Sequence, residues 1–181
     1  MKYPVFARSM ESCALLLKET ENLELFDLLT ADDDVLRQTQ VSQLAIFSVE
    51  YSLAQLYGDW GMEPHAVVGH SLGELTAACV AGAFSLEEML PFVGVRARLM
   101  GEITTPGAMA AIRLSVVEAE AKCQAYDGVE IAAVNGPSSV VVSGDKDQID
   151  EFIGALRQQE IQYHALNVSH AFHSEQVAPI L

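Results

Sequence analysis

The chemically most suggestive residues of this chain lie in the motif G-H-S-L-G-E at positions 69–74, which contains Ser71. The motif follows a short apolar run at 65–68 and precedes a longer apolar run at 75–81. A strand, a sharp turn and a helix with a serine at the turn form a nucleophile elbow. This context predicts that Ser71 is a nucleophile. The alternative is a glycine-rich turn with an unreactive serine.

An elbow of this kind makes demands on its neighbours. The turn is expected to require glycine at positions 69 and 73, because Cβ atoms there would collide with it. The helix that follows directs unpaired backbone N–H groups at any oxygen beside Ser71. We therefore predict that the N–H of Leu72 is the first donor to a negatively charged tetrahedral intermediate formed on Ser71.

Histidines near the end of the chain could supply the base that a serine nucleophile needs at neutral pH. His170 and His173 lie together in the sequence V-S-H-A-F-H-S. The chain order, serine before histidine, fits a pair of Ser71 and a histidine from this segment. A surface or packing role is the alternative for each histidine, and it is the interpretation that we favour for His65 and His164.

Hydrophobic periodicity and turn residues predict the elements that would position these side chains. In the first part of the chain we expect a strand at 65–68 and helices over 10–18, 23–29, 41–56, 75–81 and 85–100. The last helix begins with a capping-box pattern at Ser85 and contains Pro91, which could kink it. The acidic run at 32–34 could be a loop and helix-capping stretch, but a solvated run of charges is the interpretation that we favour.

The second part of the chain changes character. We expect strands over 109–114, 129–134, 140–142 and 161–168, and helices over 116–126 and 147–159, the latter capped near Asp145. The resulting order βαββαβ is that of a ferredoxin-like unit. We therefore predict an α/β protein in which a compact lobe, residues 105–168, is inserted between a first lobe, residues 1–104, and a tail, residues 169–181. The tail is expected to return to the first lobe.

Composition narrows the classes of function. The chain has 181 residues, 50% of them hydrophobic, which is enough for a sizeable core. Its formal net charge of −15 opposes nonspecific nucleic-acid binding, and it means that an anionic substrate would need local donors. No apolar run reaches the length of a membrane span, and the first residues lack a signal-peptide core. The three scattered cysteines lack metal-ligand spacing, so we expect no metal site, reduced thiols and a cytoplasmic location.

Taken together, three motifs closely resemble the acyltransferase domains of polyketide synthases, which are relatives of malonyl-CoA:acyl carrier protein transacylases. They are the elbow with its following helix through Ala83, the arginine of V-R-A-R at 95–98, and H-A-F-H at 170–173. They occur in the same order and with the same separations as in the family. The resemblance runs from about Tyr3 to the end of the chain. It implies an α/β-hydrolase-like large lobe with an inserted ferredoxin-like lobe.

The resemblance also implies roles for individual residues. Ser71 would be the acylated nucleophile and His173 its base. Arg96 would bind the free carboxylate of a malonyl group, a task that suits the planar guanidinium. A salt bridge on the helix surface is the alternative role for Arg96, and Arg98 and Arg113 are the competing candidates for the carboxylate-binding arginine.

In this family, the residues that end in the catalytic histidine indicate which extender unit is preferred. The form H-A-F-H, which contains His170 and Phe172, accompanies malonyl, whereas Y-A-S-H accompanies methylmalonyl. The Phe172 ring could occupy the space that an α-methyl group needs. One methyl group is worth only a few kcal/mol of discrimination, so the expected effect is a preference.

The implied activity is the transfer of a malonyl unit from malonyl-CoA, through a malonyl-serine ester, to the phosphopantetheine thiol of an acyl carrier protein. The implied partners are malonyl-CoA, that carrier protein and a neighbouring ketosynthase. The protein itself would need no cofactor. The rival interpretations are a serine esterase or thioester hydrolase, and a non-catalytic remnant of an acyltransferase domain.

Two departures from the family pattern concern the ends of the chain. The family's opening strand and Gly-Gln-Gly loop, which supplies a second oxyanion donor, are missing from this sequence. The elements that follow the catalytic histidine in the family are missing as well. We therefore expect an internal fragment whose large lobe is incomplete at both ends, with poor solubility and weak activity when isolated.

Overall fold

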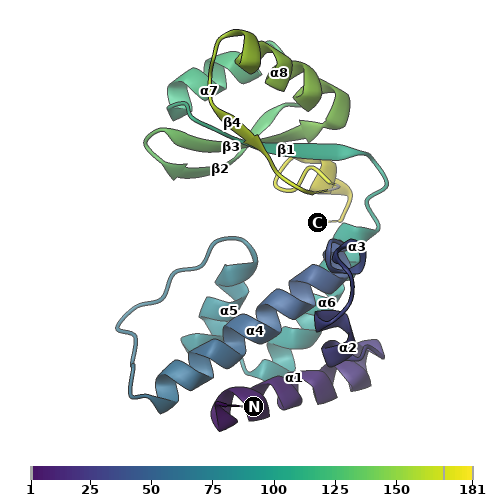
Figure 1. Cartoon of the computed structure of the whole chain (residues 1–181), viewed down its shortest axis with the longest axis vertical. Helices are drawn as coiled ribbons and strands as arrows, with labels where there is room; N and C mark the ends of the chain where they lie inside the picture. Colours follow the sequence, from purple (N-terminus) through teal and green to yellow (C-terminus); the bar gives the residue numbers. More distant parts are fainter. Residues whose placement is uncertain (1, 169, 181) are drawn as a thin grey trace. The chain divides into compact units, whose positions relative to one another are not determined.

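The structure is a computed structural model that describes residues 2–168 and 170–180. It divides into two compact units, Met1–Gly101 and Glu102–Leu181, both of which are drawn in Figure 1. The first unit is helical. The second combines helices with a small antiparallel sheet, so the chain as a whole has an α/β fold.

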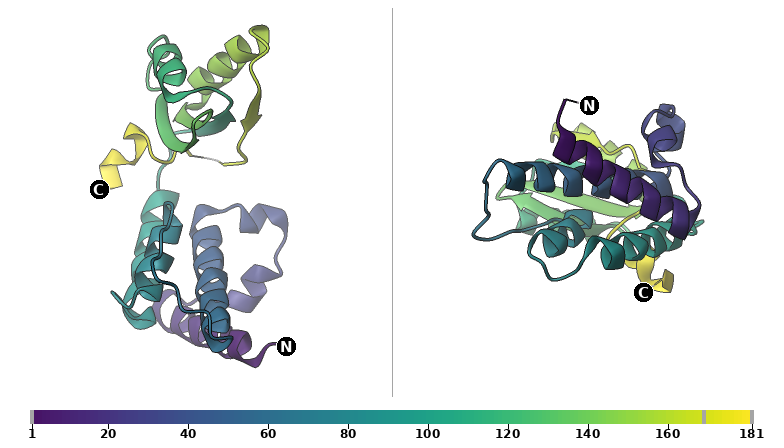
Figure 2. Two further views of the ribbon diagram at one scale, coloured as in Figure 1. Left: turned by 90° about the vertical axis from the view of Figure 1, so that its left-hand side faces the viewer. Right: turned by 90° about the horizontal axis from the view of Figure 1, so that it is seen from below.

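The first unit is built around one long central helix. Its elements are α1 (Pro4–Glu21), α2 (Leu25–Leu29), α3 (Asp33–Leu36), α4 (Thr39–Asp59), α5 (Leu72–Val80) and α6 (Leu86–Gly101). Helix α4 packs against α1, α5 and α6, an arrangement that can also be followed in Figure 2. Their apolar faces meet in a core that includes Leu17, Leu44, Phe47 and Leu90, all fully buried.

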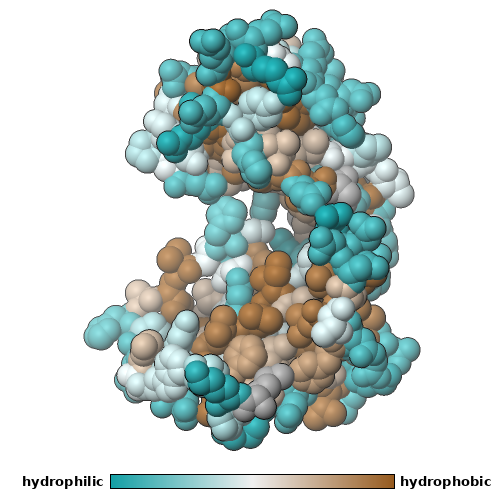
Figure 3. All heavy atoms as spheres, in the orientation of Figure 1, coloured by the Kyte–Doolittle hydropathy of each residue, from teal (hydrophilic) through white to brown (hydrophobic). Residues whose placement is uncertain are grey.

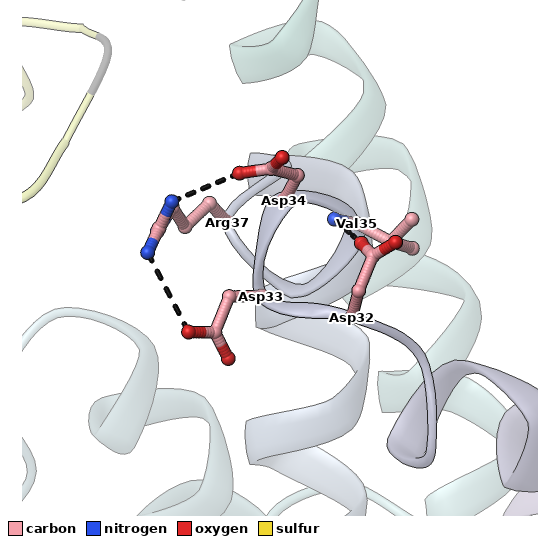
Figure 4. Close-up of polar contacts among 5 residues, drawn as sticks. All are labelled: Asp32, Asp33, Asp34, Val35 and Arg37. Atoms are coloured by element: carbon pink, nitrogen blue, oxygen red, sulfur yellow. Dashed lines mark hydrogen bonds and ion pairs between the residues drawn. The ribbon is translucent and has the colours of Figure 1, made fainter.

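The acidic run at 32–34 caps a helix as well as facing solvent. The Asp32 carboxylate accepts a hydrogen bond of 3.0 Å from the backbone N–H of Val35 and so caps α3. Arg37 forms ion pairs with Asp33 at 3.6 Å and with Asp34 at 2.9 Å, as Figure 4 shows. Both aspartates are more than four-fifths exposed, so these pairs contribute little to stability.

The predicted capping box at the start of α6 is confirmed. The Ser85 N–H donates to the Glu88 carboxylate at 2.9 Å, and the Glu88 N–H donates to Ser85 Oγ at 3.3 Å. These two bonds satisfy amides that have no partner inside the helix. They fix the start of the helix that carries Arg96.

Our prediction of a strand at 65–68 is wrong. The chain is irregular there, and Val68 is 95% exposed. The residue types suit a strand, but a strand also needs a neighbour for its backbone N–H and C=O groups. Residues 2–101, as the structure describes them, contain no strand that could pair with this segment. Apolar side chains are exposed on the drawn face of the first unit, as Figure 3 shows.

The second unit follows the expected order of strands and helices. Its elements are β1 (Gly107–Ile112), α7 (Val116–Cys123), β2 (Glu130–Gly136), β3 (Ser139–Asp145), α8 (Lys146–Gln158) and β4 (Tyr163–Ala165), followed by the 3₁₀ helix η1 (Glu175–Ile180). The sheet order is β2-β3-β1-β4, with every pair antiparallel. In the register, Ala110 lies opposite Val142 on one side and Ala165 on the other.

Helices α7 and α8 cover one face of the sheet of the second unit, which is visible in Figure 1. Phe152 and Leu156 of α8 are buried against Ile112 and Val140 of the strands. Helix α8 is capped as predicted, because the Asp145 carboxylate accepts a hydrogen bond of 2.9 Å from the N–H of Asp147. Burial of these apolar side chains and the cap at Asp145 stabilise this unit.

The tail after β4 packs within the second unit. The ring of His170 binds the backbone of Ile103, and a Cβ added to Gly107 would lie 2.1 Å from the backbone nitrogen of Ala171. Gly107 therefore permits a close approach of the tail to the start of β1. The assignment of 169–181 to the first lobe stays a prediction, and its residues 169 and 181 lie outside the described part of the chain.

The part of the chain that the structure describes contains neither a membrane-spanning helix nor a cluster of metal-ligating side chains. None of the helices in this part of the chain is long and apolar enough to cross a membrane. Among the same residues, no group of three or more histidine, cysteine, aspartate and glutamate side chains could hold a metal ion.

Candidate active site

The backbone at Ser71 is strained. Its φ of 52° and ψ of −115° place a residue with a side chain in a region that L-residues rarely adopt. Ser71 lies directly before α5, which begins at Leu72. The sharp turn that the motif predicts is therefore present. Strain of this kind concentrates at functional sites and is retained only where the surrounding structure enforces it.

The two glycines of the motif have different importance. A Cβ added to Gly69 would lie 2.2 Å from the backbone of Gly73 and from the backbone nitrogen of Glu74. The loop thus passes so close to the start of α5 that no side chain fits at Gly69. Our prediction of a collision at Gly73 is wrong, because a Cβ there would meet nothing within 4 Å.

Hydrogen bonds within the turn fix the start of α5. The N–H of Gly73 donates to the carbonyl of His70 at 3.0 Å, and the N–H of Glu74 donates to the carbonyl of Ser71 at 3.1 Å. Leu72 is the first residue of the helix, where backbone N–H groups point out of the helix end. This position is compatible with the role that we predict for the Leu72 amide.

The structure brings Arg96 to Ser71. Nη2 of the Arg96 guanidinium donates to Ser71 Oγ at 3.2 Å, although Ser71 precedes α5 and Arg96 lies on α6. The guanidinium is half-buried, and desolvation lowers its pKa from the usual value, yet an arginine keeps its charge in proteins. Of the competing candidates, Arg98 is exposed on α6, and Arg113 is exposed in the second unit, which is described separately.

A glutamine that we did not predict completes this cluster. Gln43 of α4 is buried, and its Oε1 accepts a hydrogen bond from Nη1 of Arg96. Its Nε2 donates to the sulfur of Met100 at 3.4 Å. Gln43 precedes Arg96 by 53 positions and belongs to no local motif, so only the packing of α4 on α6 reveals it.

Helix α4 also holds the helix of the elbow. Oγ1 of Thr76, a buried residue of α5, donates to the Glu50 carboxylate of α4 at 2.7 Å. The same helix therefore contacts both Arg96, through Gln43, and the elbow helix, through Glu50. A hydrogen bond to a charged carboxylate is stronger than one between neutral groups.

The histidine segment belongs to the second unit. Nε2 of His170 lies 2.7 Å from the carbonyl oxygen of Ile103, so this nitrogen donates its proton. The ring centroids of His170 and Phe172 lie 5.8 Å apart, and Ala171, which lies between them in the sequence, is fully buried. His173 has a φ of 58°, which makes it a second candidate residue with a strained backbone.

These three aromatic residues and Ser71 lie in units that we describe separately. The pairing of His173 with Ser71, and the placement of His170 and Phe172 beside a substrate, therefore stay predictions. The structure does bring together Ser71, Leu72 and Arg96 in the first unit.

Comparison with known proteins identifies the family. The family model described as "Acyl transferase domain" matches residues 1–181. The chain belongs to this family. This acyl transferase chain is 39% identical to mycoketide-CoA synthase of Mycobacterium tuberculosis over 180 residues, which are 99% of this chain and 4% of that protein. It is also 39% identical to erythronolide synthase EryA2 of Saccharopolyspora erythraea, covering 97% of this chain and 5% of the synthase.

Solved acyltransferase structures share the fold. The acyltransferase domain from the second module of the salinomycin polyketide synthase is 37% identical, with a TM-score of 0.89 over 98% of this chain and 42% of that one. The acyl-carrier-protein S-malonyltransferase of Burkholderia pseudomallei is 28% identical, with a TM-score of 0.85 over 98% of this chain and 61% of that one. The acyl transferase chain thus spans a small part of the curated synthases and about half of these solved chains.

Proposed function

We propose that this chain loads a malonyl unit from malonyl-CoA onto Ser71 and passes it to the phosphopantetheine thiol of an acyl carrier protein. One observation carries the proposal: a half-buried guanidinium, that of Arg96, donates to the hydroxyl of a strained elbow serine. A cation at that place favours an acyl group with a carboxylate at its far end, and a malonyl thioester is a short group of this kind.

The proposed reaction takes place in two half-reactions. As Ser71 Oγ attacks the thioester carbonyl, His173 accepts the hydroxyl proton, and the Leu72 N–H donates to the oxyanion of the tetrahedral intermediate. The C–S bond then breaks, and coenzyme A leaves as a thiol with the proton from His173. In the second half-reaction the carrier protein's thiol gives its proton to His173 and attacks the malonyl-serine ester. The C–O bond to Ser71 breaks, His173 returns the proton to Ser71 Oγ, and the malonyl group leaves as a thioester of the carrier protein.

Arg96 would act by charge and by position. Burial makes an unpaired cation costly, so a malonyl carboxylate that pairs with the guanidinium offsets part of that cost. The Nη2 atom already lies 3.2 Å from Ser71 Oγ, within reach of an acyl group bound to that oxygen. His170 and Phe172 are proposed to line the acyl site, where Phe172 disfavours an α-methyl group.

The finer description of the fold belongs to the same proposal. We infer a ferredoxin-like lobe from the βαββαβ order and the sheet order of the second unit. We infer an α/β-hydrolase-like lobe around the elbow from the family to which the chain belongs. The carrier protein, a neighbouring ketosynthase, a cytoplasmic location and independence from a cofactor are further parts of this proposal.

The test is the selectivity of the Arg96→Ala variant between two thioesters. We expect malonyl transfer to fall by about a hundredfold or more and acetyl transfer to change little, because a buried charge-assisted pair is worth a few kcal/mol. Initial rates of acyl-enzyme formation with malonyl-CoA and with acetyl-CoA provide the measurement. Arg98→Ala, on the exposed side of the same helix, is the matched control. Equal losses with both thioesters would show that Arg96 is structural.

A further inference from the structure

We propose that Gln43 is a positioning residue that holds the Arg96 guanidinium at Ser71 and thereby sets the preference for acyl groups that carry a carboxylate. The proposal rests on the proposed function, because it assigns to Gln43 an effect exerted through Arg96. It extends that function to a residue of α4, a helix that contributes no other residue to the predicted site.

The contacts of Gln43 fix the orientation of its side-chain amide. A guanidinium can only donate, so the atom that faces Nη1 of Arg96 must be the acceptor Oε1. The amide nitrogen then faces the sulfur of Met100 at 3.4 Å, where it donates to a weak acceptor. Gln43 is only 8% exposed, so water cannot readily replace either contact.

The position of the guanidinium follows from this arrangement. An arginine side chain has many rotamers, and ordering it costs conformational entropy. With Nη1 bound to Gln43, the planar group presents Nη2 to Ser71 Oγ. The Arg96 side chain is therefore already ordered in the folded protein before a substrate binds, so binding loses less conformational entropy. This is the general advantage of a preorganised site.

The chemistry of an amide also suits this task. The Oε1 atom of Gln43 accepts a hydrogen bond without neutralising the positive charge of Arg96. The whole charge therefore stays available to an incoming carboxylate. Desolvation already lowers the pKa of Arg96, so a partner that positions the group without cancelling its charge preserves its attraction for an anion.

Helix α4 is well placed to provide such support. Glu50 lies about two helical turns after Gln43 and so on the same face of α4. It accepts the hydrogen bond of Thr76 on the elbow helix. One rigid element thus holds the helix that begins beside Ser71 and the side chain of Arg96, which limits changes in the distance between them.

A double-mutant cycle in the natural protein tests the proposal. We expect Gln43→Leu, which removes the acceptor, to lower kcat/KM for malonyl-CoA about tenfold while leaving that for acetyl-CoA nearly unchanged. The double variant Gln43→Leu/Arg96→Ala should be no worse than Arg96→Ala alone, because Gln43 acts through Arg96. The control is Gln55→Leu, an exposed glutamine of the same helix. Equal effects of Gln43→Leu on both thioesters would overturn the proposal.

A chemical readout separates this proposal from the function on which it rests. Phenylglyoxal modifies accessible arginines, and its rate at Arg96 can be followed by peptide mass spectrometry, with exposed Arg8 as the internal reference. We expect Gln43→Leu to raise the Arg96 rate severalfold, and an unchanged rate would overturn the positioning role. Gln43→Met, a linear side chain of similar length, repeats the test if the leucine variant folds poorly.

The two assays together distinguish the outcomes. If Arg96→Ala lowers malonyl transfer selectively and Gln43→Leu does not, the role of Gln43 is wrong and the proposed function stands. If Arg96→Ala shows no selectivity, the proposed function is wrong, and the preference assigned to Gln43 is wrong with it, whatever the phenylglyoxal rate.

Discussion

The hydrogen bond between Arg96 and Ser71 joins a permanent cation to a potential nucleophile. The hydroxyl of an ordinary serine is a weak nucleophile, and a nearby cation favours any negative charge that develops on its oxygen. The same cation then attracts the carboxylate of the acyl group. A single side chain could therefore influence both the reactivity of Ser71 and its choice of substrate.

Phe172 is predicted to control the size of the extender unit. We expect Phe172→Ser to narrow the gap between malonyl-CoA and methylmalonyl-CoA by roughly tenfold, because the smaller residue leaves space for a methyl group. Competition between the two thioesters, followed by the mass of the acyl-enzyme, measures the change. A natural protein that already loads methylmalonyl as readily as malonyl would contradict the role of Phe172.

Cys13 gives the first unit a specific dependence on pH. Burial raises the pKa of its thiol to about 11, against an ordinary value of 9.0, while hydrogen bonds with Ser48 and Ser52 act in the opposite direction. As the pH rises, the unfolded chain loses this proton before the folded one. The stabilisation is therefore fully present below about pH 9 and lost as the pH approaches 11.

One pKa unit corresponds to about 1.4 kcal/mol, and pH 10.5 still lies below the pKa of the folded thiol, so the expected loss of the free energy of unfolding between pH 8 and pH 10.5 is about 2 kcal/mol. Urea unfolding at these two pH values measures it. Cys13→Ala removes the thiol, so its free energy of unfolding should fall less over the same range. If both proteins lose the same amount, other groups govern the alkaline response.

The loop before α5 depends on Gly69 far more than on Gly73. We expect Gly69→Ala to lower both the melting temperature and the rate of acyl-enzyme formation, because its Cβ would lie 2.2 Å from backbone atoms that cannot easily move. Overpacking of this kind costs about 1–3 kcal/mol or more. Gly73→Ala, with open space around its Cβ, is the matched control and should melt nearly as the natural protein does. Equal losses in the two variants would contradict this account of the turn.

The sequence predicts elements well where the signal is local. The capping box at Ser85 and the cap at Asp145 are short patterns whose partners lie within the same helical turn, and both are confirmed. The helices and the antiparallel strands of the second unit lie close to their predicted positions, with ends shifted by a few residues. Ends shift because the last turns and the last ladder bonds depend on neighbours outside the element.

Prediction fails where the deciding contact is distant. The run at 65–68 has the residue types of a strand, but whether it pairs depends on a second strand that its own sequence does not specify. Gln43 resembles any polar residue of a long helix until the packing of α4 on α6 places it against Arg96. Ser71 is predicted from its own motif, whereas the role of Arg96 follows only from the resemblance to the acyltransferase family.

The chain as a whole carries a charge of −15, yet its proposed substrate is an anion. Long-range electrostatics therefore oppose the approach of malonyl-CoA, and local donors must supply the attraction. Arg96 is such a donor, held within the hydrophobic first unit. The proposed chemistry also draws on both units, because Ser71 belongs to the first and His173 to the second.

The central claim is that Ser71 becomes acylated by malonyl-CoA, and mapping the covalent adduct tests it most directly. The natural protein is incubated with malonyl-CoA, digested and analysed by peptide mass spectrometry, with Ser71→Ala and His173→Ala treated in parallel. We predict a malonyl mass on Ser71, none in the Ser71→Ala protein, and much slower formation in His173→Ala, which lacks the proposed base. A malonyl adduct on another residue that persists in Ser71→Ala would contradict the claim.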